Sequence, residues 1–172
     1  MTTLLLVRHG ETDWNAEGRL QGHTDRPLSD YGRRQAQRLA DELAAEEFDA
    51  IYASDLARAR ETAEIVGAHL RLPVLLDPDL REKDWGTWEG LTSMERVGVE
   101  LVSESIELHT ERMLGALGRI AGRHPSGRVL VVTHGGSMRR VQAEVLGFAL
   151  PVVENCGRWA CAWKNGTVGP VD

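Results

Sequence analysis

Short apolar runs along the chain predict strands that are buried on both faces. Residues 4–7 and 129–132 are continuous apolar segments, the pattern expected of strands inside a parallel sheet. Shorter segments of the same kind cover residues 49–53 and 73–76. These four segments predict the buried strands of a central sheet.

Between the strands, apolar residues recur every three or four positions, which predicts amphipathic helices. The first helix begins after a Ser29 cap and the second after a Ser54 cap. A third helix runs from about residue 104 to 122, and a fourth follows His134 and continues to Leu146. The inner positions of the first three helices are Ala36, Leu39, Ala40, Leu43, then Leu56, Ala59, Ala63, Val66, then Ile106, Thr110, Met113, Leu117 and Ile120.

The remaining segments are polar loops and a C-terminal strand region. Residues 10–28 and 77–93 are rich in turn formers, and residues 151–154 and 158–164 are expected to form one or two short strands. The alternation of strands and helices predicts a three-layer α/β/α sandwich with a mainly parallel central sheet. The length of 172 residues, without internal repeats or linkers, predicts a single domain over residues 1–172.

The composition argues against several classes of protein. The net charge of -6 argues against a broad nucleic-acid surface, although a local basic pocket is compatible with it. No apolar run approaches the roughly 20 residues that span a bilayer, so we expect no membrane association. The start of the chain lacks the features of a signal peptide, and Cys156 and Cys161 match no zinc or C-x-x-C pattern. Together these features predict a cytoplasmic protein with free thiols.

Two of the predicted strands end in the same dipeptide, His9-Gly10 and His134-Gly135. Ligands of parallel α/β proteins bind beyond the carboxyl ends of the strands, so both histidines should face the same rim. His134 and Gly135 also lie where a helix begins, and a helix N-terminus favours an anion. The pattern therefore indicates a phosphate-binding site.

Charged residues that suit phosphate chemistry lie near the other strand ends. Arg8 precedes the first histidine, and Arg58 lies early in the helix that follows the second strand. A guanidinium binds phosphate through a fork of N–H donors. Glu82 follows the third strand in a loop, from which it is placed to donate a proton. Two histidines, two arginines and one carboxylate thus form the candidate site.

Five motifs in a fixed order resemble the histidine phosphatase (phosphoglycerate mutase-like) superfamily over nearly the whole chain. They are Arg8-His9-Gly10-Glu11-Thr12 with Trp14-Asn15, the run from Gly22 to Ser29, the run from Ser54 to Ala59, Leu80-Arg81-Glu82 with Trp88-Glu89-Gly90, and Thr133-His134-Gly135-Gly136. The resemblance implies a phosphoglycerate mutase-like fold. It is strongest to the phosphatase branch, which includes α-ribazole phosphatase and broad-specificity phosphatases, and it implies neither a metal nor a cofactor.

The resemblance also implies a role for each matched residue. His9 attacks phosphorus and becomes a phosphohistidine, while Arg8, Arg58 and His134 bind the phosphoryl group. Glu82 protonates the leaving oxygen and then helps to activate water. The residues expected to bind substrate are Asn15, Gly22, His23 and Gly135. The expected partner is a small-molecule phosphoester, and the resemblance suggests a homodimer.

The proposed roles require particular protonation states. His9 must be neutral at its attacking nitrogen, and the neighbouring Arg8 and Arg58 should lower its pKa. Glu82 must be protonated when it acts as an acid, and partial burial near a phosphate dianion should raise its pKa. These requirements predict a mildly acidic to neutral pH optimum.

Other candidate residues have structural interpretations. His69, His109 and His124 are expected to be structural or solvated, and the same interpretation stays open for His23, although its loop should border the pocket. Arg60 is expected to be a surface charge because it points away from the Arg58 face. Glu89 is interpreted as structural within the Trp-Glu-Gly turn. Trp85 and Trp88 either line a substrate mouth or pack over the loop, and the sequence leaves both open.

Three alternatives remain open at the level of sequence. The first is a phosphoglycerate mutase, although the run after Glu82 leaves little room for the mutase insertion and Lys83 is the one nearby cation. The second is a catalytically lapsed phosphate-binding module, and the third is a zinc or iron hydrolase. The segment after Gly90 is short, with Ser103-Glu104-Ser105 in place of a Gly-Glu-Ser element. It suggests an open pocket for varied or bulky substrates, such as α-ribazole phosphate, while phosphosugars and phosphoglycerate derivatives also fit.

Overall fold

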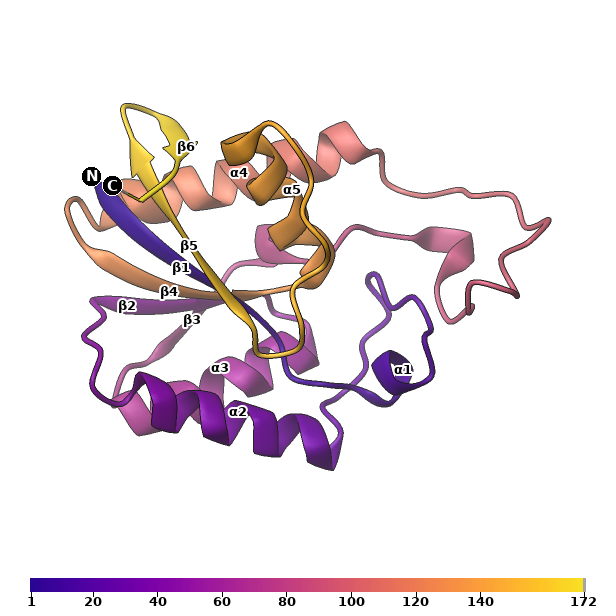
Figure 1. Cartoon of the computed structure of the whole chain (residues 1–172), viewed down its shortest axis with the longest axis horizontal. Helices are drawn as coiled ribbons and strands as arrows, with labels where there is room; N and C mark the ends of the chain where they lie inside the picture. The colour runs from indigo at the N-terminus through magenta and orange to yellow at the C-terminus, as the bar shows by residue number, and fades with distance from the viewer. Residues whose placement is uncertain (172) are drawn as a thin grey trace.

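Strand β1 (Thr2–Arg8) and strand β4 (Arg128–Thr133) lie side by side within a six-stranded sheet in the computed structural model, which describes residues 1–171 (Figure 1). The strand order is β3-β2-β4-β1-β5-β6, and β1 to β4 pair in parallel. The last two strands add in antiparallel orientation beside β1. The other strands are β2 (Ala50–Ala53), β3 (Val74–Leu76), β5 (Arg158–Lys164) and β6 (Thr167–Gly169).

Helices cover both faces of this sheet. On one face, α2 (Asp30–Leu43) packs beside α3 (Ala57–Leu70), and the opposite face is covered by α4 (Ile106–Arg123) and α5 (Gly135–Leu146) (Figure 1). The predicted three-layer α/β/α sandwich with a mainly parallel sheet is therefore confirmed. Short helical turns lie within the connecting loops: α1 (Asp13–Ala16), η1 (Pro78–Leu80) and η2 (Gly86–Trp88).

The alternation of side chains along β1 contributes to two separate cores. Leu4 and Leu6 join the cluster that includes Met113 of α4, whereas Leu5 and Val7 join the cluster built with α2 and α3. All four β1 side chains are buried. The strand is thus buried on both faces, as its continuous apolar run predicted.

The register of the central strands brings the histidine-bearing strand ends together. Arg8 pairs with Thr133 across β1 and β4, and the N–H of His9 donates to the Thr133 carbonyl at 3.0 Å. On the other side of β4, the N–H of Ser54 donates to the carbonyl of Val132 at 3.0 Å. The residues that follow β1, β2 and β4 therefore meet at one rim, where ligands of parallel sheets bind.

The predicted start of α3 at Ser54 is wrong. The N-cap is Leu56, and the Ser54 hydroxyl accepts from the Leu56 N–H at 3.3 Å ahead of the helix. The same hydroxyl bonds the ring of His134 at 2.9 Å. Ser54 therefore belongs to the rim of the sheet rather than to the helix cap, and Arg58 lies in the first turn of α3.

The start and the inner face of α4 also differ from the prediction. The N-cap is Ser105, whose hydroxyl accepts from the N–H of Leu108 at 3.1 Å. Glu104 lies ahead of the helix, with its carboxylate bound by Arg112 at 2.9 Å. Ile106 is half-exposed, since the first turn of α4 extends to the mouth of a cavity, whereas His109 is buried. The inner face of the helix therefore includes a histidine that the apolar pattern did not predict.

Residues 151–154 form a loop rather than the predicted strand. The carbonyl of Val153 accepts from the Arg8 guanidinium at 2.7 Å, and Asn155 Nδ2 donates to the His9 carbonyl at 3.0 Å. These groups bind the end of β1 instead of joining a strand ladder. β5 matches the predicted 158–164 strand, while β2 and β3 each begin one residue later than predicted.

Candidate active site

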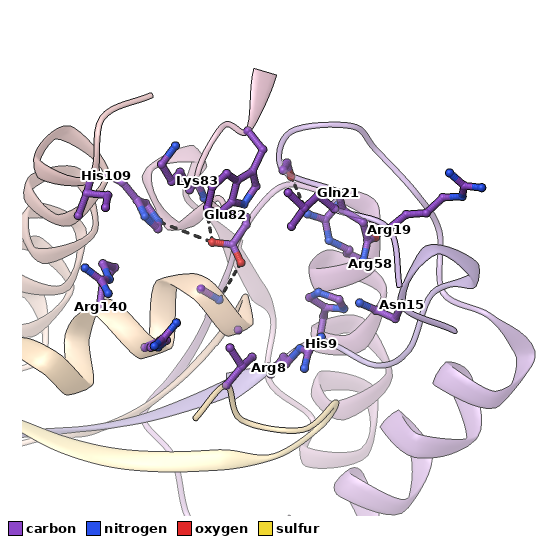
Figure 2. A pocket seen from close by; sticks show the side chains of 18 residues that line it. Arg8, His9, Asn15, Arg19, Gln21, Arg58, Glu82, Lys83, His109 and Arg140 are labelled. Carbon is purple, nitrogen blue, oxygen red and sulfur yellow. Dashed lines mark hydrogen bonds and ion pairs between the residues drawn. The ribbon is translucent and has the colours of Figure 1, made fainter. Parts of the chain in front are cut away.

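The carboxyl edge of the sheet opens into a cavity of about 350 Å³ (Figure 2). Arg8, His9, Arg58 and Glu82 line it, together with the first residues of α5. His134, the fifth residue of the predicted catalytic set, lies behind this lining and is almost fully buried. The structure thus brings all five residues to one place, although they are distributed between positions 8 and 134 of the chain.

The ring of His9 is held with one nitrogen free. Its Nδ1 lies 2.6 Å from the carbonyl of Gly10, which can only accept, so Nδ1 carries the proton and Nε2 keeps a lone pair. Burial, followed by the charges of Arg58 and Arg8, holds the pKa of His9 well below its usual value. His9 is therefore neutral at neutral pH, with Nε2 as an unprotonated nitrogen.

His134 lies beside His9, with ring centroids 5.2 Å apart. Its Nε2 is 2.9 Å from the hydroxyl of Ser54, which also accepts from a backbone N–H and is free to donate its own proton to the ring. Burial and the charge of Arg58 hold the pKa of His134 well below its usual value. A neutral ring that accepts at Nε2 carries its proton at Nδ1.

Arg8 and Arg58 bring positive charge into the buried part of the cavity. Their guanidinium groups bind backbone carbonyls rather than carboxylates: Arg8 binds Val153, and Arg58 binds Thr24 and Gly22 at 3.0 and 2.7 Å. Burial lowers the pKa of Arg58 to about 10, with Glu82 opposing this effect, so the guanidinium stays charged at neutral pH. Two poorly compensated cations beside two neutral histidines form a site for an anion.

Unpaired buried donors mark the same place. Four buried side-chain polar atoms lack a hydrogen-bond partner within residues 1–171, and three of them are Arg8 Nε, Arg58 Nε and His134 Nδ1. A buried donor without a partner costs about 1–3 kcal/mol. Phosphoryl oxygens, which accept strongly, would satisfy these N–H groups. The charge and the unsatisfied donors therefore favour the same ligand.

Glu82 faces His9 across the cavity (Figure 2). Its Oε2 accepts from the N–H of Gly136 at 2.8 Å, and its Oε1 accepts from the N–H of Lys83 at 2.9 Å. Gly136 is in the first turn of α5, so the helix N-terminus holds the carboxyl group in place. An added Cβ at position 136 would lie 2.5 Å from Glu82 Oε1, which explains the glycine.

Three of the four predicted substrate-binding residues line the cavity, namely Asn15, Gly22 and Gly135. Asn15 Oδ1 accepts from the Thr12 N–H and from Asn155, so its Nδ2 is the group that can donate to a ligand. Gly22 has a φ of 53°, a conformation that favours glycine, and its carbonyl holds Arg58. These residues therefore lie around the same cavity as Arg8, His9 and Arg58.

The structure places His23, the fourth predicted substrate-binding residue, outside the cavity lining. Its ring is turned toward the loop of residues 77–93 that carries Glu82, the acid-bearing loop. His23 Nε2 lies 3.0 Å from the carbonyl of Glu82. Glu89 holds the same loop, accepting from the N–H groups of His23, Thr24 and Trp85 at 2.8 to 3.1 Å. Glu89 is thus structural, as predicted, and His23 supports Glu82 rather than reaching the cavity.

The sequence interpretation missed several residues at the cavity. Three of these residues, His109, Arg139 and Arg140, line the cavity. Ser54 lies behind the lining, where its hydroxyl bonds Nε2 of His134. Arg140 lies four positions after Gly136 on α5, and this helical spacing could have indicated that both face the cavity. Ser54 begins one of the matched motifs, but nothing in the sequence pointed to its bond with His134, 80 residues away, and no signal pointed to His109, whose partner is 28 residues away.

The two tryptophans have different positions. Trp85 lines the cavity, and the Lys83 ammonium lies 4.3 Å from the centre of its ring. Trp88 stacks on Trp85 and donates to the carbonyl of Val99 at 3.0 Å, so it packs over the loop. The Ser103-Glu104-Ser105 element contacts this loop as well, since Ser103 Oγ accepts from Lys83 Nζ at 2.7 Å.

Metal-ligand geometry is lacking throughout residues 1–171, where no group of three or more His, Cys, Asp and Glu side chains could hold an ion. Cys156 and Cys161 are free thiols, as predicted, and burial raises the pKa of each to about 12. Among the described residues, no helix is both long and apolar enough to cross a membrane.

The sheet and its histidine- and arginine-lined rim define a phosphoglycerate mutase-like phosphatase. Comparison with known proteins agrees. The family model of the histidine phosphatase superfamily (branch 1) matches residues 4–164. The chain belongs to the histidine phosphatase superfamily.

Individual relatives match most of the chain. The uncharacterized phosphatase PhoE of Bacillus subtilis (strain 168) is 38% identical over 152 residues, which cover 86% of this chain and 79% of the relative. A metal-independent phosphoserine phosphatase of Arabidopsis thaliana is 35% identical over 84% of this chain and 69% of its own length. The solved structure of Bacillus stearothermophilus YhfR has a TM-score of 0.89 and 35% identity, covering 98% of this chain and 94% of YhfR. These comparisons support phosphatase activity on small phosphorylated substrates.

Proposed function

We propose that this chain hydrolyses small phosphomonoesters through a phosphohistidine intermediate on His9. The observation that carries the proposal is the state of the His9 ring, which is neutral, protonated at Nδ1 against Gly10 and unprotonated at Nε2. Such a nitrogen is a nucleophile, and the guanidinium groups of Arg8 and Arg58 beside it attract a phosphoryl group.

In the first step, His9 Nε2 attacks phosphorus while the bond from phosphorus to the leaving oxygen breaks. Glu82, in its protonated form, gives its proton to that oxygen, and the alcohol departs. The hydrogen bond from Nδ1 to the Gly10 carbonyl stabilises the positive charge that develops on the ring. Arg8, Arg58 and His134 Nδ1 donate to the three phosphoryl oxygens, which matches their unpaired N–H groups.

In the second step, water attacks the phosphohistidine from the side that the alcohol has left. Glu82 is now a carboxylate and takes a proton from this water as its oxygen bonds to phosphorus. The bond between phosphorus and His9 Nε2 breaks, which releases inorganic phosphate and returns the ring to its neutral state. Both steps use the same carboxyl group in opposite protonation states.

The cavity also suggests which substrates fit. Arg140 and Lys83 lie on the far side of Glu82 from His9 (Figure 2). Because Glu82 must reach the leaving oxygen, the rest of the leaving group extends toward these cations. A phosphomonoester with a carboxylate or a second phosphate on its alcohol part fits this distribution of charge.

The proposal is tested by measuring phosphate release in the presence of a metal chelator. The substrates are 4-nitrophenyl phosphate, 3-phosphoglycerate, phosphoserine, sugar phosphates and α-ribazole phosphate. We expect chelator-resistant turnover that falls by at least about a thousandfold in His9→Ala and is unchanged in His69→Ala, which alters a partly exposed histidine of α3. Acid-labile radioactive phosphate on the wild-type chain, but not on His9→Ala, would identify the intermediate.

The same assay separates the alternatives. A mutase would interconvert phosphoglycerate isomers faster than it releases phosphate, which phosphorus NMR detects directly. A lapsed binding module would bind phosphate and release no product from any substrate. Loss of activity on chelation would indicate a metal hydrolase, and turnover that persists in His9→Ala would overturn the phosphohistidine mechanism.

A further inference from the structure

A third buried histidine, in addition to His9 and His134, lies behind the carboxyl group of Glu82. His109, on the second turn of α4, is only 2% exposed, and its ring points toward Glu82 from the side opposite His9 (Figure 2). His109 has no role in the two proposed steps of phosphoryl transfer. A buried imidazole needs hydrogen-bond partners, so the contacts of its ring nitrogens indicate what it does.

The His109 ring is connected to Glu82 through a serine hydroxyl. His109 Nε2 lies 2.9 Å from Ser137 Oγ, and this hydroxyl lies 3.4 Å from Glu82 Oε1 and 3.2 Å from the carbonyl of Arg81. The direct distance from His109 Nε2 to Glu82 Oε1 is 3.9 Å. The hydroxyl of Ser137 is therefore the hydrogen-bond link between the imidazole and the acid-bearing loop.

The hydroxyl of Ser137 has one proton to donate, so the protonation of His109 Nε2 decides which acceptor receives that proton. When His109 Nε2 carries a proton, it donates to Ser137 Oγ, and the hydroxyl proton is free to bind Glu82 or the Arg81 carbonyl. When Nε2 lacks a proton, it competes for the hydroxyl proton and draws it away from Glu82. A donor at position 109 therefore supports the acid-bearing loop.

Burial favours an uncharged His109 ring at neutral pH, while the charges around it act in both directions. Burial lowers the pKa of His109, and Glu82 opposes this effect most strongly. Glu104 also raises the pKa, while Arg112 and Lys83 lower it. His109 therefore influences Glu82 mainly through its N–H group rather than through a full positive charge.

We propose that His109 is a positioning residue for Glu82, holding the carboxyl group through Ser137 in the orientation from which it protonates the leaving oxygen. The inference rests on the proposed function, because it assigns Glu82 the role of proton donor. After the proton has left, the hydrogen bond from Ser137 stabilises the Glu82 carboxylate at Oε1. The backbone N–H groups of Lys83 and Gly136 hold the same carboxyl group from other directions.

This role has a consequence that a purely structural role lacks. A proton donor matters most when the leaving oxygen is a basic alkoxide and least when it is a weakly basic phenolate. Disturbing Glu82 should therefore slow cleavage of 3-phosphoglycerate far more than cleavage of 4-nitrophenyl phosphate. A general loss of folding or of phosphate binding would slow both reactions equally.

The test compares kcat/KM for these two substrates in His109→Phe, His109→Gln and Ser137→Ala, with Glu82→Gln and His9→Ala alongside. We expect His109→Phe and Ser137→Ala to lose about tenfold or more on 3-phosphoglycerate and no more than about twofold on 4-nitrophenyl phosphate. His109→Gln retains an N–H donor and should restore part of the loss. Glu82→Gln should show the same selectivity with a larger effect.

The matched control is His124→Phe, which changes the C-cap histidine of the same helix, bonded to the hydroxyl of Tyr52. It should leave the ratio of the two kcat/KM values unchanged. Equal losses on both substrates, or none, in His109→Phe and Ser137→Ala would overturn the positioning role, and selective loss in Glu82→Gln would then leave the proposed function intact. Turnover that survives in His9→Ala would overturn both.

Discussion

At the level of single residues, two groups among the cations that line the cavity differ in their position relative to Glu82. Arg58 and Arg8 lie near His9 and, after burial, contribute to its lowered pKa, whereas Arg140 lies beyond Glu82 (Figure 2). The first group is placed to bind the transferred phosphoryl group. The second is placed to bind the alcohol part of the substrate, so substitutions in the two groups should have different effects.

We expect Arg140→Gln to lower kcat/KM for 3-phosphoglycerate by about tenfold, because a charge-assisted hydrogen bond in a partly buried place contributes about 1.5 kcal/mol. The effect on 4-nitrophenyl phosphate, whose leaving group carries no anion, should stay within about twofold. Steady-state kinetics with both substrates measures the difference.

Arg60→Gln is the matched control, because Arg60 lies on the exposed surface of α3 and pairs only loosely with Glu64 at 3.8 Å. It should leave kcat/KM unchanged for both substrates. An equal loss of kcat/KM for both substrates in Arg140→Gln would show that Arg140 does not bind the leaving group.

The sequence led to some site residues more readily than to others. His9 and His134 each follow an apolar strand and precede glycine, so both their place and their chemistry were predictable. Ser54 and His109 carry no such local mark. Their functions depend on partners that only the packing of β2 beside β4, and of α4 beside α5, brings within hydrogen-bond distance.

At the level of elements, the first turn of α5 organises the acid side of the site. Its N–H group at Gly136 binds Glu82, and its Gly135 lies against Arg8, where a Cβ would come within 3.1 Å of the guanidinium Nε. Two glycines at the start of a helix are poor helix formers. Their presence is explained by close approaches: a Cβ at position 136 would meet Glu82 Oε1 at 2.5 Å, and one at position 135 would meet Val152 Cγ1 at 2.6 Å, nearer than Arg8.

Gly136→Ala should therefore lower activity without lowering stability. The added methyl group would displace the carboxyl end of Glu82, which is flexible, so folding should be little affected. We expect kcat/KM for alkyl phosphates to fall about tenfold while the melting temperature stays the same or rises slightly, because alanine favours helix over glycine. Thermal unfolding and kinetics on one preparation measure both.

Gly122→Ala provides the comparison, since a Cβ at that position of α4 meets none of the described residues within 4 Å. It should raise stability by about 0.5–1 kcal/mol and leave kinetics unchanged. A drop in stability of several kcal/mol in Gly136→Ala, with matching losses on every substrate, would argue that the glycine serves packing rather than the position of Glu82.

The elements differ in how far local pattern determines them. α2 begins after the predicted Ser29 cap and buries the predicted residues Ala36, Leu39, Ala40 and Leu43, because its cap and its apolar stripe both lie within the helix. The irregular segment 151–157 has apolar residues that suit a strand. Its backbone instead binds Arg8 and His9, which are distant in sequence, so local pattern could not reveal its conformation.

At the level of the whole molecule, function and stability are linked through the buried histidines. His9 and His134 are both nearly fully buried and held neutral in the folded chain. Their pKa values lie below the usual value near 6.5 in the folded state and return to it on unfolding. Between these values the unfolded chain binds more protons, so stability rises with pH across that window.

We therefore expect the free energy of unfolding to fall as the pH drops below about 6.5, with each of these histidines contributing up to about 1.4 kcal/mol per pH unit. Urea denaturation in phosphate-free buffers from pH 7.5 to 5 measures the slope. In His9→Gln the slope should be smaller by about the contribution of one histidine.

His69→Gln is the control for this slope, because His69 is partly exposed and its ring is 3.9 Å from Asp41 at the surface. It should follow the wild-type pH dependence. A wild-type slope that His9→Gln leaves unchanged would show that His9 is not held neutral by burial.

The sequence by itself determined the alternation of strands and helices, the placement of His9 and His134 at strand ends, and the order of the family's motifs. These properties are local, because strand, helix and turn preferences depend on neighbours a few residues apart. Tertiary structure decided the tautomer and charge state of His9, the support of Glu82 by α5, His23 and Ser137, and the path of residues 151–157. Each of these depends on burial and on hydrogen bonds between distant segments, which exist only after the sheet has assembled and its helices have packed against it.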